Sequence, residues 1–404
     1  MLINQTFEID SCDDVELNIK RTSKLEYRIS YDDEKDIKAI VFVIGGYGAN
    51  ANISFLDFDR EYIAKNFDVV VVHVFYHCFC ARISNNKKYS ASISFMEEDL
   101  LSLSKILLDF GINPQNLDCK NSTKYYELLI QHIIILKSQG KLAQNYQAKF
   151  TSTFIPPNGD YQNYGIMAAI DHINALKDLV KRFPKFADLP KIYGGGSYGG
   201  YLALLIAKIA PWYVDGVIDN SGTVLPLLEC IIGKDLSRPE FFFSDLNKLV
   251  GMFIKTYWTR EDERLSYFFT NENYMIRSLL NSSHLTIQAS VNKNIILVSY
   301  HSLKDPFNTA KDKQTLFLAY KELGYDATLH LIKDESEIDG RFIKDLNHGM
   351  RITDKALFRK ELPLMLEKLQ KRKSFMQENS ISYPCGNKVF TFKDVENQLK
   401  LIIN

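Results

Sequence analysis

An excess of charge of one sign is absent from this sequence. Lysine and arginine together number 49, aspartate and glutamate also number 49, and the formal net charge is +0. Nucleic-acid-binding surfaces and polybasic membrane attachment need a clear excess of lysine and arginine. The composition therefore argues against nucleic acid and against a membrane as partners, and it leaves the oligomeric state unknown.

Long apolar runs and a secretion signal are also missing. No apolar run approaches the ~20 residues that a membrane-spanning helix needs. The segment Met1–Glu8 has no basic stretch followed by an apolar one, so we expect no signal peptide. At 404 residues and 46% hydrophobic content, the chain has ample material for one α/β domain with insertions, or for two smaller domains.

Cysteine is scarce, and its six positions show no spacing typical of a disulfide framework. This favours a reducing, cytoplasmic setting. His73, His77, Cys78 and Cys80 are close in sequence, which invites a metal-site interpretation. On one strand, however, the two histidines would share one face and the two cysteines the opposite face. We therefore expect satisfied histidines and buried thiols, with no metal and no cofactor.

Glycine, by contrast, is concentrated around one serine. Residues 194–200 read Gly-Gly-Gly-Ser-Tyr-Gly-Gly and contain the pattern G-x-S-x-G with Ser197 at its centre. Lys191–Tyr193 precedes the pattern as a short strand, and Tyr201–Ala207 follows it as an apolar helix. In this context the pattern presents a nucleophilic serine. The alternatives are a turn that only packs and a phosphate cradle, although no Lys-Ser or Lys-Thr follows.

Candidates for an acid and a base follow the serine in chain order. Asn294–Tyr300 is expected to be a strand, and Asp305 lies just beyond its carboxyl end, where sites in open α/β sheets form. After a further strand, Ala327–Ile332, comes His348, and Gly349 leaves room around its ring. The plainer interpretations are a turn-capping aspartate and an ordinary surface histidine.

The three residue types suit one another chemically. A serine hydroxyl attacks poorly until a base removes its proton, and neutral imidazole suits that role. A carboxylate that accepts the other ring N–H orients the imidazole and stabilises its charged form. We therefore predict Ser197 as nucleophile, His348 as base and Asp305 as orienting acid. Asp219, at the end of the strand-like run 214–219, is the alternative acid.

The loop after an early strand is a candidate for binding an oxyanion. Lys38–Ile44 is nearly all apolar, as expected of a central strand covered on both faces, and residues 45–48 then read Gly-Gly-Tyr-Gly. In such folds this loop supplies one backbone N–H and the residue after the serine supplies another. We predict the N–H of Gly46 or Tyr47 together with that of Tyr198. The alternative is a tight turn without this role.

These motifs resemble one known family. Gly195–Tyr201 is similar to the nucleophile segment of the prolyl-oligopeptidase-like branch of the α/β-hydrolase superfamily. Asp305, then Tyr320–Tyr325, then His348 with its glycine resemble that branch's acid–helix–strand–histidine block. The resemblance implies an α/β-hydrolase fold in which Ser197 is the nucleophile, His348 the base and Asp305 the acid.

The resemblance covers roughly residues 185–225 and 290–370, and the chain also departs from it. Full oligopeptidases carry a large amino-terminal propeller, whereas about 37 residues precede the first core strand here. The loop Lys333–Asn347 is longer than usual. These departures favour a stand-alone esterase or acyl-transferring enzyme over a peptidase. The whole chain also resembles a poorly characterised bacterial group of α/β-hydrolase-like proteins, some linked to surface or flagellar sugar modification.

The expected fold is a doubly wound, mostly parallel α/β sheet of the α/β-hydrolase type with helical cap insertions. We expect the chain to be divided into a core of residues 1–81, 163–222 and 291–373, a first insertion at 82–162, an aromatic-rich second insertion at 223–290, and a carboxyl-terminal appendage at 374–404.

Several local elements can also be predicted. Val15–Arg21 and Leu25–Tyr31 suggest an edge hairpin, and Phe95–Phe110 and Tyr125–Gln139 suggest helices in the first insertion. The second insertion is expected to be mostly helical. In the appendage, Ile381–Phe392 suggests a hairpin followed by a short helix.

The sequence as a whole predicts a serine esterase that forms a covalent acyl-enzyme from a small ester or an acylated sugar. The alternatives are an O-acyltransferase that moves an acetyl group to a sugar, a peptidase of the prolyl-oligopeptidase type, and a catalytically silent binding protein. Aromatic residues of the second insertion would line a pocket for an acyl chain or a sugar, or form that insertion's own core.

Overall fold

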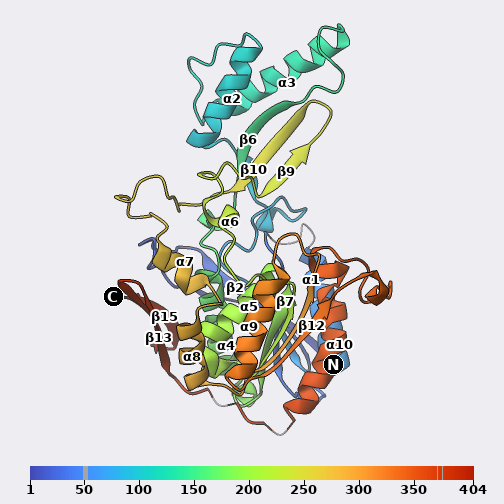
Figure 1. Ribbon diagram of the computed structural model, residues 1–404, viewed down its shortest axis with the longest axis vertical. Helices are drawn as coiled ribbons and strands as arrows, with labels where there is room; N and C mark the ends of the chain where they lie inside the picture. Colours follow the sequence, from blue (N-terminus) through green and yellow to red (C-terminus); the bar gives the residue numbers. More distant parts are fainter. Residues whose placement is uncertain (49–52, 371, 375) are drawn as a thin grey trace. The chain divides into compact units, whose positions relative to one another are not determined.

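The computed structural model describes residues 1–48, 53–370, 372–374 and 376–404 (Figure 1). The chain divides into two compact units. The first, named the core unit here, consists of Met1–Phe79, Tyr164–Pro226 and Phe269–Asn404. The second, the insertion unit, consists of Cys80–Asn163 and Leu227–Phe268.

An eight-stranded sheet forms the centre of the core unit. The strands follow the order β1-β2-β4-β3-β7-β8-β11-β12. Their bounds are β1 Leu2–Asp10, β2 Lys24–Asp32, β3 Ile40–Val43, β4 Val70–Phe75, β7 Lys191–Gly196, β8 Gly216–Asn220, β11 Ile296–Ser302 and β12 Asp326–Ile332. The pairs β1–β2 and β2–β4 are antiparallel, and the pairs from β4 to β12 are parallel. The expected α/β class with a mostly parallel sheet is confirmed.

Helices cover both faces of this sheet (Figure 1). The helices on the two faces are α1 Ile53–Phe67 and α10 Asp354–Lys368 on one side, and α4 Ile166–Arg182, α5 Tyr198–Ile209, α8 Ser282–Val291 and α9 Ala310–Glu322 on the other. Successive strand residues point to opposite faces. Thus Val41 joins the apolar cluster beneath α1 and α10, whereas Phe42 lies against His172 of α4. Burial on both faces explains why β3 and β4 are nearly continuous runs of valine, isoleucine and phenylalanine.

The amino-terminal hairpin differs from the predicted one. Strand β2 agrees with the expected Leu25–Tyr31, but its partner is β1, so the strand predicted at Val15–Arg21 is wrong. Asp14 and Ile19 form only an isolated bridge, because Asp14 Oδ1 accepts the N–H of Leu17 and Asn18 adopts a φ of 52°. A left-handed residue within so short a segment produces a turn rather than an extended strand.

A three-stranded antiparallel sheet ends the core unit. It consists of β13 Ser380–Cys385, β14 Lys388–Val395 and β15 Gln398–Ile403. The predicted hairpin is thereby confirmed, but the short helix expected after it is wrong. Leu399 and Leu401 are buried while their neighbours are more exposed, and this period of two belongs to a strand.

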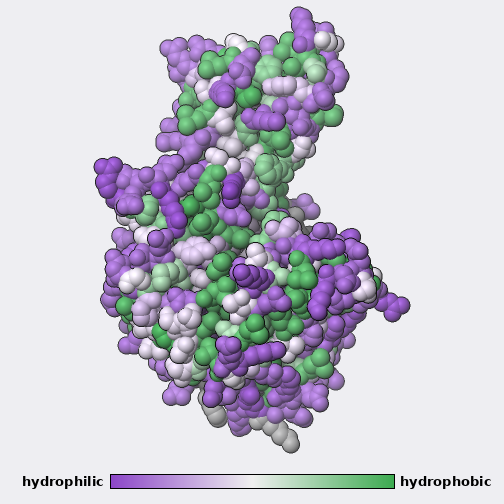
Figure 2. Space-filling view, viewed as in Figure 1, coloured by the Kyte–Doolittle hydropathy of each residue, from purple (hydrophilic) through white to green (hydrophobic). Residues whose placement is uncertain are grey.

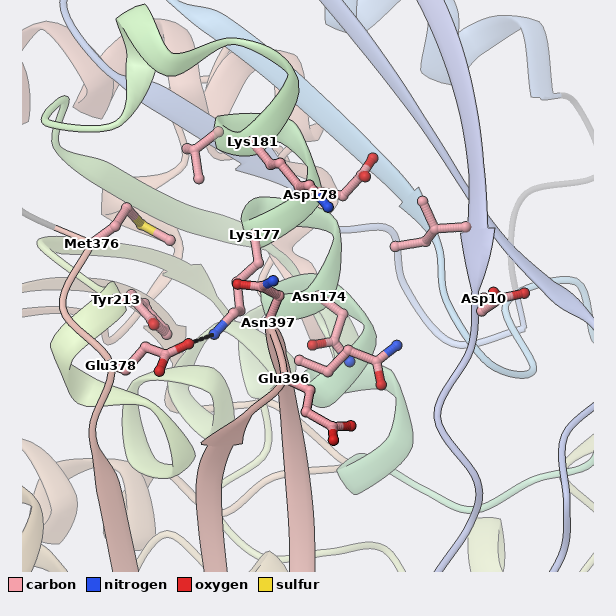
Figure 3. Close-up of a pocket in the computed structure, with 13 residues that line it drawn as sticks. Asp10, Asn174, Lys177, Asp178, Lys181, Tyr213, Met376, Glu378, Glu396 and Asn397 are labelled. Atoms are coloured by element: carbon pink, nitrogen blue, oxygen red, sulfur yellow. Dashed lines mark ion pairs between the residues drawn. The ribbon is translucent and has the colours of Figure 1, made fainter.

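Buried polar contacts hold this sheet to the rest of the core unit. The Asp394 carboxylate of β14 lies 2.6 Å from Lys177 Nζ of α4, and it accepts hydrogen bonds from Trp212 Nε1 and Tyr213 OH. The Asp394 side chain is fully buried and that of Lys177 nearly so. Figure 3 shows Lys177 also facing Glu378, at 3.5 Å. Unpaired buried charges are costly, so these partners fix the position of the sheet.

The insertion unit has a sheet of its own, so its two segments are not mainly helical as expected. The sheet order is β5-β6-β10-β9, with bounds β5 Ser92–Ser94, β6 Ala148–Ile155, β10 Lys248–Ile254 and β9 Phe241–Ser244. Helices α2 Glu97–Asp109 and α3 Ser122–Ser138 agree with the predicted ones. The apolar run of β10 pairs in parallel with β6, about 100 residues earlier in the chain. That distant partner explains why the second segment forms strands instead of helices.

The longest helices that the structure describes, α3 and α4, have 17 residues each. None of the helices in the described part of the chain is long and apolar enough to cross a membrane.

Candidate active site

Ser197 occupies a strained turn between β7 and α5. Its φ and ψ are 56° and −122°, a conformation that L-residues rarely adopt and that costs about 1–3 kcal/mol. The neighbouring glycines make the turn possible. A Cβ atom on either Gly195 or Gly199 would lie 2.0 Å from the carbonyl oxygen of Ile44. The turn therefore has the form of a nucleophile elbow, with the serine at the carboxyl end of a central strand.

The structure brings Ser197, His348 and Asp305 into one hydrogen-bonded chain. Ser197 Oγ lies 2.8 Å from His348 Nε2, and His348 Nδ1 lies 2.8 Å from Asp305 Oδ2. With Nδ1–H donating to the carboxylate, Nε2 is left to accept the serine hydroxyl. The Asp305 side chain is fully buried, whereas that of His348 is 20% exposed. This is the relative geometry that a serine, a base and an orienting acid require.

The Asp305 carboxylate is fixed from both sides. Its Oδ1 accepts the backbone N–H groups of Phe307, at 2.9 Å, and Asn308, at 3.2 Å. Burial raises the pKa of Asp305, but the hydrogen bond from His348, together with the Phe307 N–H, outweighs it and holds the pKa below its usual value. The carboxylate is therefore charged at neutral pH.

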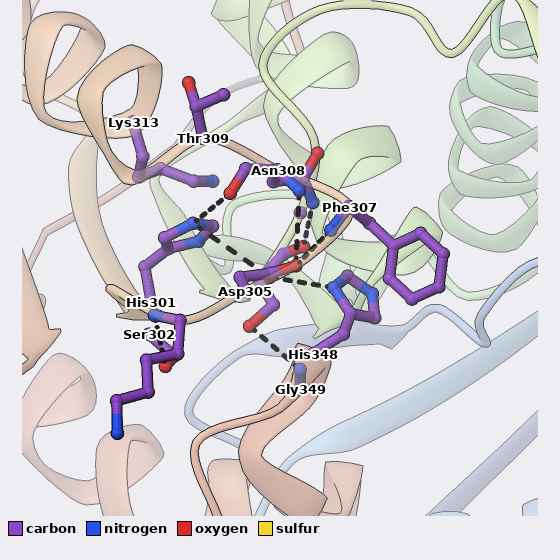
Figure 4. Close-up of polar contacts among 12 residues, drawn as sticks. His301, Ser302, Asp305, Phe307, Asn308, Thr309, Lys313, His348 and Gly349 are labelled. Carbon is purple, nitrogen blue, oxygen red and sulfur yellow. Dashed lines mark hydrogen bonds and ion pairs between the residues drawn. The ribbon is translucent and has the colours of Figure 1, made fainter. Parts of the chain in front are cut away.

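His301 lies behind this carboxylate (Figure 4). Its Nε2 is 4.0 Å from Asp305 Oδ2 and 3.3 Å from the carbonyl oxygen of Asn308. The ring is fully buried. Burial and the nearby positive charge of Lys313 lower its pKa, so His301 is neutral beside the charged Asp305. His301 was not among the residues predicted from the sequence. Its position at the carboxyl end of a predicted parallel strand, where sites of such sheets form, could have indicated it.

Backbone contacts position the imidazole of His348. The next residue, Gly349, has a φ of 73°, which glycine adopts without strain. Its N–H donates to Ser221 Oγ, and its carbonyl oxygen accepts from Asn220 Nδ2. The ring of Phe307 packs edge-on against the imidazole at 5.1 Å. Asn220 and Ser221 were missed from the sequence, and their position at the end of β8 could have indicated them.

Asp219, the alternative acid, is engaged elsewhere. Its Oδ2 lies 2.6 Å from Lys313 Nζ and accepts the Ser299 hydroxyl at 2.6 Å. Both members of the ion pair have fully buried side chains. Asp219 Oδ1 accepts the backbone N–H of Gly222. Its oxygens thus satisfy a buried lysine and a turn, and the histidine contacts Asp305 instead.

The predicted oxyanion residues lie around Ser197. Tyr198 is the first residue of α5, so its backbone N–H has no acceptor within the helix. A Cβ on Gly46 would lie 4.0 Å from Ser197 Cβ, which places the loop after β3 beside the serine. The rings of Tyr47 and Tyr198 pack edge-on at 5.3 Å. This arrangement is compatible with the predicted pair of amide donors, whose role stays a prediction.

The segment with closely spaced histidines and cysteines is part of the buried core of the protein. His73 is buried, and burial lowers its pKa to about 3. The backbone N–H of His77 donates to Asp171, whose carboxylate also pairs with Arg21 at 2.9 Å. Among the residues placed in the structure, no group of three or more His, Cys, Asp or Glu side chains could hold a metal ion.

Comparison with known families identifies the chain at the family level. A family model described as "Protein of unknown function (DUF2920)" matches residues 5–403. The chain belongs to this family. For this DUF2920 member, the comparison with curated proteins finds no match.

Solved structures similar to this DUF2920 protein are hydrolases by their printed names. Pyrococcus horikoshii acylaminoacyl peptidase is 14% identical with a TM-score of 0.45, and the match covers 94% of this chain and 43% of the peptidase. Thermogutta terrifontis esterase 2 is 12% identical with a TM-score of 0.38, and the match covers 86% of this chain and 89% of the esterase. The chain thus spans less than half of the peptidase. The assignment of the α/β-hydrolase fold rests on the strand order of the core unit.

Proposed function

We propose that this protein is a serine hydrolase, and more narrowly an esterase that cleaves a small ester or an acylated sugar. The supporting observation is the continuous contact from Asp305 through His348 to Ser197, with both distances at 2.8 Å and the serine on a strained turn. A structural serine gains nothing from such strain, whereas a nucleophile gains exposure to the substrate.

The reaction begins when Ser197 Oγ attacks the ester carbonyl and its proton passes to His348 Nε2. The new imidazolium is stabilised by Asp305, and the oxyanion accepts hydrogen bonds from the amides of Tyr198 and of Gly46 or Tyr47. Collapse of this intermediate breaks the bond to the alcohol, which leaves with the proton from His348. The acyl group stays on Ser197 until water attacks it and gives a proton to His348 Nε2. The bond from the acyl carbon to Ser197 Oγ then breaks, His348 returns the proton to Oγ, and the acid leaves.

The test is the intact mass of the protein after incubation with a fluorophosphonate. We expect one adduct on the wild-type chain and none on Ser197→Ala, because only an activated serine with a formed oxyanion site reacts readily. Ser290→Ala is the matched control, since this exposed serine of α8 lies outside the triad. An adduct that persists in Ser197→Ala, or one that is lost in Ser290→Ala, would refute the assignment.

A second assay separates hydrolysis from transfer. Short acyl esters are supplied with and without a sugar acceptor, and the products are identified by mass. Free acid as the sole product supports the esterase, whereas an acylated sugar points to transfer by the same triad.

A further inference from the structure

The insertion unit contains a cavity that the proposed chemistry does not use. Its volume is about 670 Å³, within the range of small-molecule sites. The apolar part of its lining consists mainly of Phe95, Phe150, Phe154, Phe243, Val250 and Met252. All of its lining residues belong to the insertion unit.

One face of the small sheet forms the floor of the cavity. Strand residues two apart share a face, so Phe150 and Phe154 of β6 point the same way, as do Val250 and Met252 of β10. The register pairs Val250 with Phe150 and Met252 with Ser152, which brings the two rows together. Apart from the Ser152 hydroxyl, which donates to Met252 Sδ, this face is apolar, and such a surface suits an acyl chain or an aryl ring.

Apolar side chains are also exposed at the edge of the cavity. Ile83 and Ile93 are each 52% exposed, and Phe243 is 53% exposed, and all three belong to the lining. Figure 2 shows apolar surface over β9 and β10 among the polar groups of this unit. Exposed apolar clusters of this kind commonly mark binding sites.

The charged side chains that line the cavity are all positive among the described residues. Arg82 and Lys248 line the cavity, and no Asp or Glu is among the described residues that do so. Lys248 Nζ donates to the Tyr126 hydroxyl and lies 3.4 Å from Asp245, whose side chain is 40% exposed. Burial lowers the pKa of Lys248, and the contacts with Tyr126 and Asp245 raise it by more, so the ammonium group stays charged.

We propose that this cavity binds a small carboxylate with an apolar body, whose carboxylate contacts Lys248 and the Tyr126 hydroxyl. Tyr126 accepts from the lysine through its oxygen, so its own O–H can donate to the ligand. The body lies against Phe150, Val250 and Met252. An acyl and an aryl carboxylate share this chemistry, and the experiment distinguishes them.

The test is calorimetric titration of the full chain with octanoate, 3-phenylpropionate and 1-octanol. We expect a carboxylate to bind and the neutral alcohol to bind about tenfold or more weakly, because a hydrogen bond to a charged group is lost. Preference for octanoate identifies an acyl ligand, and preference for 3-phenylpropionate an aryl one. If neither carboxylate binds, or if octanol binds as tightly, the proposal is overturned.

Matched variants locate the binding. Lys248→Met should weaken carboxylate binding about tenfold and leave octanol binding unchanged. Lys149→Met is the control, because Lys149 lies on β6 with its side chain exposed and on the opposite face from Phe150. Val250→Phe fills the cavity and should weaken both classes of ligand. Equal effects of the two lysine variants, or unchanged binding to folded Val250→Phe, would exclude this cavity.

Ser197→Ala separates this site from the proposed hydrolase. Octanoate binding should be unchanged in that variant, while reaction with the fluorophosphonate is lost. The binding site and the catalytic assignment can therefore fail independently.

Discussion

At the scale of single residues, the two carboxylates near the candidate site differ in their partners. Asp305 contacts a histidine whose other nitrogen contacts a serine, whereas Asp219 contacts a buried lysine. The same side-chain chemistry thus contacts a histidine in one place and pairs with a buried lysine in the other. Substitution by asparagine should affect different properties of the protein at the two positions.

Asp305→Asn should lower kcat for ester cleavage by about 10³–10⁴-fold, because the amide no longer favours the tautomer in which His348 Nε2 accepts a proton. The free energy of unfolding should change little in comparison. Steady-state kinetics and urea unfolding measure the two effects. Asp219→Asn is the comparison, since it leaves the charge of buried Lys313 without its partner and should destabilise the fold. A larger loss of kcat in folded Asp219→Asn would contradict the assignment of the acid.

A third carboxylate, Asp354, contacts the elbow itself. Asp354 Oδ1 accepts the N–H of Gly196 at 2.9 Å, and burial raises its pKa to about 7, with a smaller contribution from Asp59. The residue as a whole keeps some exposed surface, so the electrostatic effect is smaller than full burial would give. Because Asp354 begins α10 next to the strand that presents Ser197, its charge state influences the stability of this region.

The raised pKa of Asp354 has a definite sign in the pH dependence of stability. The folded state binds this proton more tightly than the unfolded state, so the contribution is complete below about pH 4 and is lost as pH rises toward about 7. Between pH 5 and 7 the full effect would be about 2.3 kcal/mol, because the carboxyl group is already half ionised at pH 7. Partial exposure reduces it, and we expect about 1–2 kcal/mol.

Asp354→Asn removes this titration. In urea unfolding, the wild-type chain should lose stability relative to the variant as pH rises from 5 to 8. Curves that run parallel over this range would show that Asp354 titrates normally.

At the scale of elements, the small carboxyl-terminal sheet depends on one buried carboxylate. Asp394→Ala would leave Lys177 with the exposed Glu378, 3.5 Å away, as its remaining acidic partner, so we expect a loss of about 3–5 kcal/mol. Asp326→Ala is the control, because its pair with Lys368 is exposed and should contribute less than about 1 kcal/mol. Urea unfolding measures both, and equal losses would contradict the anchoring role.

Some helices and strands could be predicted from short segments of the sequence, whereas others depend on partners that are distant in the chain. The elbow, and Asp305 and His348 as candidates, follow from local glycine content and from positions after apolar strands, so they could be proposed from short segments. Strand β10 could not, because its partner β6 is about 100 residues away and local periodicity carries no information on that pairing. The choice between Asp305 and Asp219 likewise depended on where Lys313 lies in space.

At the scale of the whole molecule, the two units have separate apolar cores. That of the insertion unit includes Leu103 and Leu107 of α2 and Leu129 of α3, each with 0% exposure. The core unit has its own cluster around the central sheet. Local unfolding follows such cores, since each is held by contacts among its own members.

Leu107→Ala should therefore destabilise the insertion unit by about 2–5 kcal/mol through the cavity it leaves. Hydrogen exchange should accelerate in peptides from α2, α3 and β6, and exchange in β7 and α5 should be unchanged. Reaction of Ser197 with the fluorophosphonate provides a second readout of the core unit, and its rate should be retained. Leu204→Ala, a fully buried substitution in α5, should produce the reverse pattern. Equal acceleration in both units after either change would mean that the two cores unfold as one.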